Sequence, residues 1–328
     1  MNIYDIAREA GVSIATISRV LNNKGTVSPA TRARVEAVLA RYNYTPSAIA
    51  RGMVSRSMRT VAVLTVDIRA PRCARTVYTL EREFSRRGYD TLLCNTGGSR
   101  DETLRALNAV RKKQVDGIVL AGSVFGTLCQ GAEIEKLLTG LPVVLANGRL
   151  ALPTACSVMV DDGYGAALAV EHLARQGRKN LYYLQDQDTP SARAKWDGFR
   201  AAMARAGLES SGHLLRSGET PDEALRAVRQ LLAADSHPDG LLCGGEVTAL
   251  GALKALRQAG YSVPGQVAVI ACNDSDYARL AEPALTAIDN KPEQMALLCV
   301  QLLENRLAQD GSCSSVTLQP ELVERETG

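Results

Sequence analysis

The sequence predicts an α/β protein with a small helical head: a helix-turn-helix unit of three helices, a hinge helix, and a two-lobed core with parallel sheets. Apolar residues repeat with a helical period over residues 1–45, whereas strand-like apolar runs alternate with helical segments over residues 60–328. The charge changes at the same place, because residues 1–60 hold nine Lys/Arg and three Asp/Glu, against 29 and 32 in the remainder. Residues 46–59 are then the hinge and linker.

Two short helices joined by a glycine turn open the head. The first is predicted over residues 3–10, where one apolar face is formed by Ile3, Ile6, Ala7 and Ala10. Asn2 is its expected cap, and Gly11 supplies a left-handed stop. Ser13 is the expected cap of the second helix, whose inward side chains are Ala15 or Thr16, then Ile17, Val20 and Leu21.

A third helix closes this small core. Ser28 and Pro29 open it, and Val35, Val38 and Leu39 face inward. Two helices joined by a tight turn, on a head of positive charge, indicate a unit whose second helix enters the major groove of DNA. A three-helix unit that contacts another protein, or a plain solvated basic surface, is the alternative.

The early side chains of the second helix are the candidate DNA contacts. Arg19 can donate a pair of hydrogen bonds to guanine, and Ile14 and Ala15 can contact a thymine methyl group. Short polar side chains suit phosphate oxygens instead, and these are Ser13, Thr16, Ser18 and Asn23 or Asn22.

The stretch IYDIAREAGVSIATISRVLN, followed by VSPATRARVEAVLARYNYTPSAIARGM, resembles the DNA-binding head of the lactose-repressor/purine-repressor (LacI/GalR) family. This resemblance places Ile14, Ala15 and Arg19 where the family reads bases. It therefore implies that double-stranded operator DNA is a partner of this chain.

The resemblance also implies that a hinge helix over residues 47–53 of each subunit enters the minor groove of DNA. Such a helix has few partners of its own, so it would order only when docked on DNA. Met53 stands at the position that wedges between base steps, and Ala48 and Arg51 are further expected contacts. A plain flexible linker is the alternative.

Beyond residue 60 the chain alternates buried strands, such as VAVLTVD and VAVIACND, with helices, such as VYTLEREFSRRG. This alternation is typical of parallel sheets covered on both faces. We expect LPVVLAN to complete a first lobe and VMVDD to begin a second. Ligands of such sheets bind at the carboxyl ends of the strands, which predicts a site in the cleft between the lobes.

Several functional classes lack support in the sequence. No GxGxxG opens a helix after a strand, and Walker-A and GxSxG motifs are missing, so no enzyme and no cofactor are predicted. The eight cysteines form no CxxC pair and the three histidines lie far apart, so no metal site is predicted. Without a long apolar run or a secretory signal, we expect a cytoplasmic protein that does not bind membranes.

The core also resembles this regulator family, most clearly in VDDGYGAALAVEHLARQG, SARAKWDGF, TALGALKALRQAG and EPALTAI. The implied fold is that of the periplasmic sugar-binding proteins. The resemblance implies that Asp162 accepts hydrogen bonds from effector hydroxyls and that Arg193 binds the effector. Asp162 is alternatively the cap of the helix that follows it, and Arg193 is alternatively an exposed residue.

Other expected effector contacts depart from the family pattern. Asn273 stands where Asp is common, and Gly245 replaces an amide that grips the ligand, so Glu246 is the candidate replacement. The loop after the first strand has arginines where aromatic residues are common, namely Arg69, Arg72 and Arg75. If one of them, Arg72 in particular, faces the cleft with Arg193, an acidic effector is favoured; a neutral sugar and an unresponsive pocket are the alternatives.

Together these features predict a homodimeric regulator, most simply a repressor of carbohydrate-utilisation genes, whose operator affinity is controlled by a sugar-like effector between the lobes. A dimer is expected because a helix-turn-helix head gains affinity by binding two half-sites at once. The tail QPELVERETG has no heptad leucines, so no tetramer-forming coiled coil is expected. A ligand-insensitive DNA binder remains the main alternative.

Overall fold

The computed structural model describes residues 3–21, 25–42, 57–234, 236–308 and 315–328. The chain divides into two compact units, one of residues 1–60 with 114–116 and one of residues 61–113 with 117–328. Each unit is described by itself below. The predicted hinge helix over residues 47–53 lies outside the described residues.

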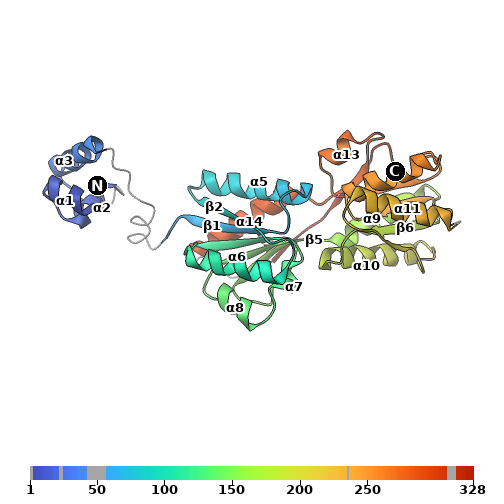
Figure 1. Ribbon diagram of the computed structural model, residues 1–328, viewed down its shortest axis with the longest axis horizontal. Helices are drawn as coiled ribbons and strands as arrows, with labels where there is room; N and C mark the ends of the chain where they lie inside the picture. The colour runs from blue at the N-terminus through green and yellow to red at the C-terminus, as the bar shows by residue number, and fades with distance from the viewer. Residues whose placement is uncertain (1–2, 22–24, 43–56, 235, 309–314) are drawn as a thin grey trace. The chain divides into compact units, whose positions relative to one another are not determined.

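The head is built from α1 (Ile3–Ala10), α2 (Ile14–Leu21) and α3 (Pro29–Arg41), which confirms the predicted helix-turn-helix unit (Figure 1). Its core is fully buried at Ile6, Ile17 and Val35, one residue from each helix. Gly11 adopts φ +63° between α1 and α2, the left-handed region that glycine enters without strain. As expected, Ser28 caps α3 by accepting a hydrogen bond from the Thr31 amide.

The first lobe of the core contains a six-stranded sheet in the order β11-β5-β4-β3-β1-β2. Its strands are β1 (Thr60–Thr65), β2 (Asp90–Asn95), β3 (Gly117–Ala121), β4 (Val143–Ala146), β5 (Ala155–Val160) and β11 (Ser315–Leu318). Its helices are α5 (Pro71–Arg86), α6 (Arg100–Lys112), α7 (Phe125–Leu128), α8 (Ala132–Leu138) and α14 (Pro292–Leu307). Side chains of α5 and α14 pack together on one face of this sheet, with α6 and α8 drawn on the other side in Figure 1.

The second lobe contains another six-stranded sheet, in the order β12-β10-β9-β8-β6-β7. Its strands are β6 (Leu181–Gln185), β7 (Leu214–Arg216), β8 (Gly240–Cys243), β9 (Ala268–Cys272), β10 (Thr286–Asp289) and β12 (Glu321–Val323). Its helices are α9 (Asp162–Arg175), α10 (Pro190–Arg205), α11 (Pro221–Ala233), α12 (Glu246–Gln258) and α13 (Asp276–Leu280).

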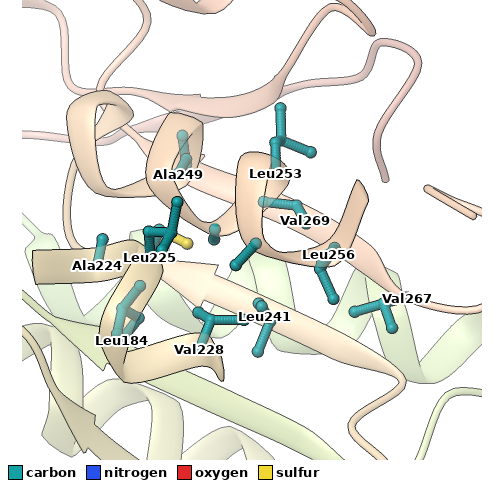
Figure 2. Packing of buried hydrophobic residues seen from close by; sticks show 14 of the residues in the cluster. Leu184, Ala224, Leu225, Val228, Leu241, Ala249, Leu253, Leu256, Val267 and Val269 are labelled. Carbon is teal, nitrogen blue, oxygen red and sulfur yellow. The ribbon is translucent and has the colours of Figure 1, made fainter. Parts of the chain in front are cut away.

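Strand residues of the second lobe alternate between two buried clusters. Leu241 and Val269 pack with α11 and α12 (Figure 2), whereas the next residues along, Leu242 and Ile270, pack with α9 and α10. Because successive side chains of a strand point to opposite faces, both faces of the sheet are covered by helices. This confirms the predicted parallel, doubly covered sheets, apart from one antiparallel pair that the sequence did not reveal, β10 with β12.

The chain passes between the lobes three times. After β5 it enters α9 of the second lobe, after β10 it returns through α14, and after β11 it crosses again to β12. The division of the lobes expected from the sequence was therefore wrong: β5, which contains the VMV run, is paired in parallel with β4 and belongs to the first sheet. Sequential alternation of strands and helices carries no signal of which sheet a strand joins, because that choice is made by distant partners.

Candidate functional site

In the head, α2 separates a buried face from an exposed one. Ile17 and Val20 are buried at 0% and 6% exposure, whereas Ile14, Ala15 and Arg19 are exposed. An exposed isoleucine at 37% is a large apolar side chain that the head leaves uncovered. All three residues expected to read bases are therefore exposed on α2, and their contact with bases stays a prediction.

The expected phosphate contacts begin the same helix. Ser13 accepts a hydrogen bond from the Thr16 amide at 3.2 Å, and the two hydroxyls lie 3.0 Å apart. The N-terminus of a helix presents free amides and a partial positive charge, both of which favour a phosphate. Ser18 is partly buried. The other predicted DNA contacts lie outside the described residues, namely Asn23 (with Asn22), Ala48, Arg51 and Met53.

In the core, a cavity of about 460 Å³ lies between the lobes. Residues just after the strands line it, as predicted for this class of sheet: Asp67 follows β1, Asn147 follows β4, Asp186 follows β6, Asn273 follows β9 and Asn290 follows β10. A cavity of this size suits a ligand such as a mono- or disaccharide.

Two buried side chains of opposite charge, Asp162 and Lys195, lie close together in the cavity lining. Their side chains are 6% and 11% exposed, and Lys195 Nζ lies 3.8 Å from Asp162 Oδ1. Asn147 Nδ2 donates to Asp162 Oδ2 at 3.4 Å, but Oδ1 accepts no hydrogen bond from any described residue. Burying a carboxylate oxygen without a donor is costly, so this atom is an unsatisfied hydrogen-bond acceptor in the wall of the cavity.

Lys195 keeps its charge in this environment. Burial by itself lowers the pKa of its ammonium group, but the opposing effects of Cys272, Asp162 and Asp186 leave the pKa raised. Lys195 therefore stays protonated at neutral pH and can donate to a ligand oxygen.

Two expectations about these elements need correction. The cap of α9 is Asp161, whose Oδ1 accepts from the Tyr164 amide at 2.9 Å, and not Asp162, which the helix leaves free to line the cavity. Arg193 does not line the cavity; its Nε donates to Asp188 Oδ1 at 2.7 Å and its side chain is 63% exposed. The structure puts Lys195, two residues further on, at the place expected for Arg193.

The phase of α10 explains this shift. The buried face of that helix contains Ala192, Lys195, Phe199, Ala202 and Met203, at helical spacing. Arg193 is off this stripe, so its side chain points to solvent. The stripe was readable in the sequence, and it would have selected Lys195.

The remaining predicted effector residues line the cavity. Arg72 lies in the first turn of α5, Glu246 opens α12, and Asn273 adopts φ +71° and accepts a hydrogen bond from Asn290 Nδ2 at 2.9 Å. Glu246 is 3% exposed and accepts from the Ser275 amide. Burial raises the pKa of its carboxyl, although the Ser275 contacts oppose the shift.

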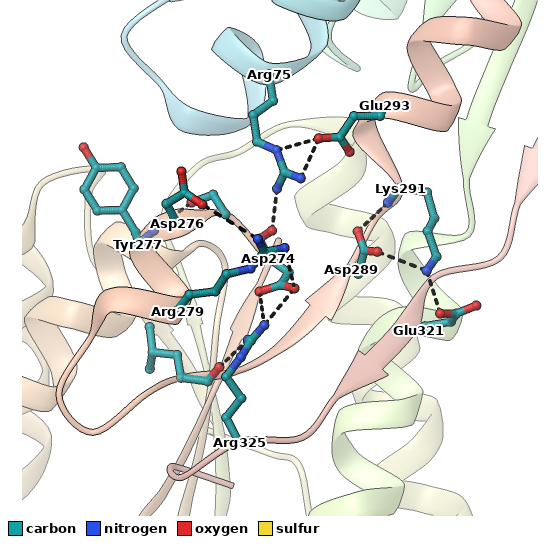
Figure 3. A network of polar contacts seen from close by, with 12 residues as sticks. Arg75, Asp274, Asp276, Tyr277, Arg279, Asp289, Lys291, Glu293, Glu321 and Arg325 are labelled. Atoms are coloured by element: carbon teal, nitrogen blue, oxygen red, sulfur yellow. Dashed lines mark hydrogen bonds and ion pairs between the residues drawn. The ribbon is translucent and has the colours of Figure 1, made fainter.

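A polar bridge joins the lobes beside the cavity (Figure 3). Arg75, on α5 of the first lobe, donates through Nε to Glu293 Oε1 at 2.9 Å and through Nη1 to the backbone carbonyl of Asp274, which follows β9 of the second lobe. Arg325 holds the Asp274 carboxylate at 2.8 Å. Of the three arginines expected in a loop after β1, Arg69 precedes α5 and lines the cavity, Arg72 in the first turn of α5 also lines it, and Arg75 on α5 forms this bridge.

The sequence analysis missed other cavity residues, among them Asp186, Asn147, Ser191 and Asn290. Asp186 packs closely on Gly244, where an added Cβ would lie 2.4 Å from Asp186 Oδ1. Asp186, Asn147 and Asn290 come directly after β6, β4 and β10, and this position at strand ends was the sequence signal that could have identified them as cavity residues.

In the described part of the chain, no group of three or more His, Cys, Asp and Glu side chains could hold a metal ion. No helix among the described residues is long and apolar enough to span a membrane.

A helix-turn-helix unit with an exposed second helix, followed by a two-lobed core of the binding-protein type, defines a DNA-binding transcription regulator. The pattern of bacterial regulatory proteins of the lacI family matches residues 2–47, and that of a periplasmic binding protein-like domain matches residues 170–327. This chain belongs to the lacI family of bacterial regulatory proteins, whose members are transcriptional regulators and not enzymes.

Relatives match over the full length. An HTH-type transcriptional regulator of Lachnoclostridium phytofermentans is 31% identical over 100% of this chain and 99% of its own. The ribose operon repressor of Escherichia coli K12 is 32% identical over 98% of both chains. The solved structure of the lac repressor dimer bound to operator and the anti-inducer ONPF is similar in fold, with a TM-score of 0.90 at 22% identity, over 100% of this chain and 98% of that chain.

Proposed function

We propose that this protein is a homodimeric, sequence-specific repressor of carbohydrate-utilisation genes, and that a sugar-like effector in the cavity between its lobes controls its affinity for operator DNA. One observation carries the effector part: Asp162 Oδ1 is buried in the cavity without a donor among the described residues, beside a charged Lys195. A hydroxyl group both donates and accepts, so a single sugar hydroxyl satisfies both residues at once. The name of the E. coli relative, a ribose operon repressor, supports the carbohydrate class.

The coupling follows from the way the cavity is built. Both lobes contribute to its lining, so an occupant contacts both and favours one relative pose of the lobes over others. Arg75 joins α5 of the first lobe to the backbone after β9 of the second lobe. A change in the relative pose of the lobes would therefore change the length of this hydrogen bond. An effector changes DNA affinity only to the extent that its own affinity differs between the two poses.

The DNA part rests on the exposed face of α2. An arginine that forms paired hydrogen bonds with a base contributes about 1–3 kcal/mol of discrimination, so Arg19→Ala should weaken binding to the operator by about 5- to 150-fold. The matched control is Arg34→Ala, which removes the same charge from an exposed position on α3. Loss of that charge should weaken binding far less and equally for all DNA sequences.

The experiment measures binding of the full-length protein to labelled DNA from upstream of its own gene, at fixed salt, by fluorescence anisotropy, with and without neutral sugars, sugar acids and sugar phosphates. The proposal expects tight, Arg19-dependent binding that at least one compound changes. Equal losses in the two arginine variants would refute specific reading by α2. Tight binding that no compound alters would favour the ligand-insensitive regulator and refute the effector part.

A further inference from the structure

The arginines around the cavity differ in one respect. Arg69 is paired with Asp67 at 2.7 Å, Arg75 with Glu293, and Arg193 with Asp188. Arg72 lines the same cavity, yet its guanidinium group forms no hydrogen bond or ion pair with any described residue. Arg72 thus brings an uncompensated positive charge to the ligand cavity.

A second cationic side chain lines the same cavity as Arg72. Lys195 lines the cavity from the second lobe, so one cationic side chain from each lobe faces the same cavity. Two like charges that face one partly enclosed cavity repel each other, and an anion between them relieves that repulsion.

The backbone around Arg72 also suits an anion. Arg72 lies in the first turn of α5, a helix of 16 residues whose cap position, Ala70, offers no side-chain hydrogen bond. Ala70, Pro71, Arg72 and Cys73 all line the cavity, so this helix presents its N-terminal end there. Helix N-termini favour negative charge because their first amides lack intrahelical partners.

Five carboxyl groups of the described residues line the cavity, but none of them pairs with Arg72. Asp67 is paired with Arg69 and Asp162 lies beside Lys195, whereas Asp186, Glu219 and Glu246 form no ion pair with the Arg72 guanidinium group. Asp162 Oδ1 still lacks a hydrogen-bond donor, although the Asp162 side chain is only 6% exposed. This second observation points to a ligand with a hydroxyl group. The first-lobe wall therefore favours an oxyanion and the second-lobe wall favours hydroxyl donors.

We infer that the effector is a polyhydroxylated anion, a sugar-like molecule with one carboxylate or phosphate group, that Arg72 and the start of α5 bind the anionic group, and that Asp162 accepts a hydrogen bond from a hydroxyl. This inference rests on the proposed effector function of the same cavity. A guanidinium group suits both oxyanions, because its paired donors match carboxylate and phosphate geometry.

The test uses the full-length protein and four matched probes: D-glucose, D-gluconate, D-glucuronate and D-glucose 6-phosphate, each also in its galactose form. Binding is measured by titration calorimetry, with inorganic phosphate and D-glucosamine as anion-only and cationic comparators. We expect at least one acidic probe to bind at least about 10-fold more tightly than its neutral parent and than inorganic phosphate, in line with a charge-assisted hydrogen bond.

Two variants assign the effect. Arg72→Ala should weaken the acidic probe by about 10-fold or more and leave the neutral parent unchanged, and Arg72→Lys should restore part of the affinity. Arg69→Ala is the matched control, since Arg69 lines the same cavity but is already paired with Asp67. It should change the affinity less than about 3-fold, as expected of an exposed ion pair.

Three outcomes overturn the inference. The first is a neutral probe or glucosamine that binds more tightly than every acid, the second is equal losses in the two alanine variants, and the third is no binding of any acid. The operator assay separates these from failure of the proposed function. A neutral sugar that alters operator affinity leaves the regulator intact and refutes only the anionic class, whereas no response to any probe refutes the effector function itself.

Discussion

Replacing Gly198 with alanine should destabilise the second lobe. Gly198 lies on α10 where that helix crosses α9, and an added Cβ would lie 2.1 Å from the Gly163 carbonyl oxygen and 2.5 Å from the Gly163 Cα. The obstructing atoms are backbone, so the helices must separate by about 1 Å to reach ordinary contact. Overpacking of this kind costs about 1–3 kcal/mol, and the alanine regains about 1 kcal/mol of helix propensity. Because the clash is with backbone atoms, we take the overpacking cost at the upper end of its range, about 3 kcal/mol, which leaves a net loss of about 2 kcal/mol.

The assay is urea unfolding of the full chain followed by the fluorescence of its single tryptophan, Trp196. This residue stacks on Phe199 at 5.6 Å between ring centroids, beside the site of the substitution. With a urea m-value of about 3 kcal/mol per M, the midpoint should fall by about 0.7 M.

Gly163→Ala on the facing helix is the matched control. Its added Cβ would lie 3.3 Å from the Ala194 carbonyl oxygen, a tight contact that a small shift relieves, so its midpoint should stay close to that of the wild type. The wider crossing in Gly198→Ala should also move Asp162, on α9, away from Lys195, on α10, and weaken effector binding. A Gly198→Ala midpoint equal to or above that of Gly163→Ala would refute the close-packing argument.

Two further predictions concern buried groups. Burial raises the pKa of Glu246 above its ordinary 4.5, so the native state binds the proton more tightly than the unfolded state and the free energy of unfolding falls as the pH rises from about 4.5 through the folded pKa. The wild type should therefore lose stability relative to Glu246→Gln over that range in urea unfolding at stepped pH, and a pH-independent difference would contradict this. Ile17 is fully buried in the head, so Ile17→Ala should lower the free energy of unfolding by about 2–5 kcal/mol. This loss is enough to unfold so small a unit and to abolish operator binding. The exposed Ile14→Ala variant should keep the head folded in its amide NMR spectrum, and a folded head in Ile17→Ala would refute the assigned core.

The head was readable from the sequence because its determinants are local. Apolar spacing within each helix indicates Ile6, Ile17 and Val35 as core residues, and Ser28 with Pro29 indicates the start of α3; each of these signals spans only a turn or two of its own helix. The alternating order of strands and helices in the core was readable for the same reason.

The arrangement of the core, and part of its site, could not be predicted from the sequence. The partner of β11 is β5, more than a hundred residues earlier, and neither strand contains a signal that selects the other. The SAR motif points to Arg193, whereas the helical phase of α10 puts Lys195 on the buried face of the helix. The pairing of Arg69 with Asp67, which leaves Arg72 as the arginine free to meet a ligand, depends on side-chain geometry that residue spacing does not fix.

The three passages of the chain between the lobes have a consequence for synthesis on the ribosome. The first sheet acquires its edge strand β11 only at residues 315–318, and the helix that covers β3, β4 and β5, α14, only at residues 292–307. Until then α5 covers only part of this apolar sheet face, and the part over β4 and β5 stays exposed, a surface prone to aggregation and to capture by chaperones. Neither lobe can be completed until almost all of the message has been translated, so a premature stop near the 3′ end should leave both lobes unfinished.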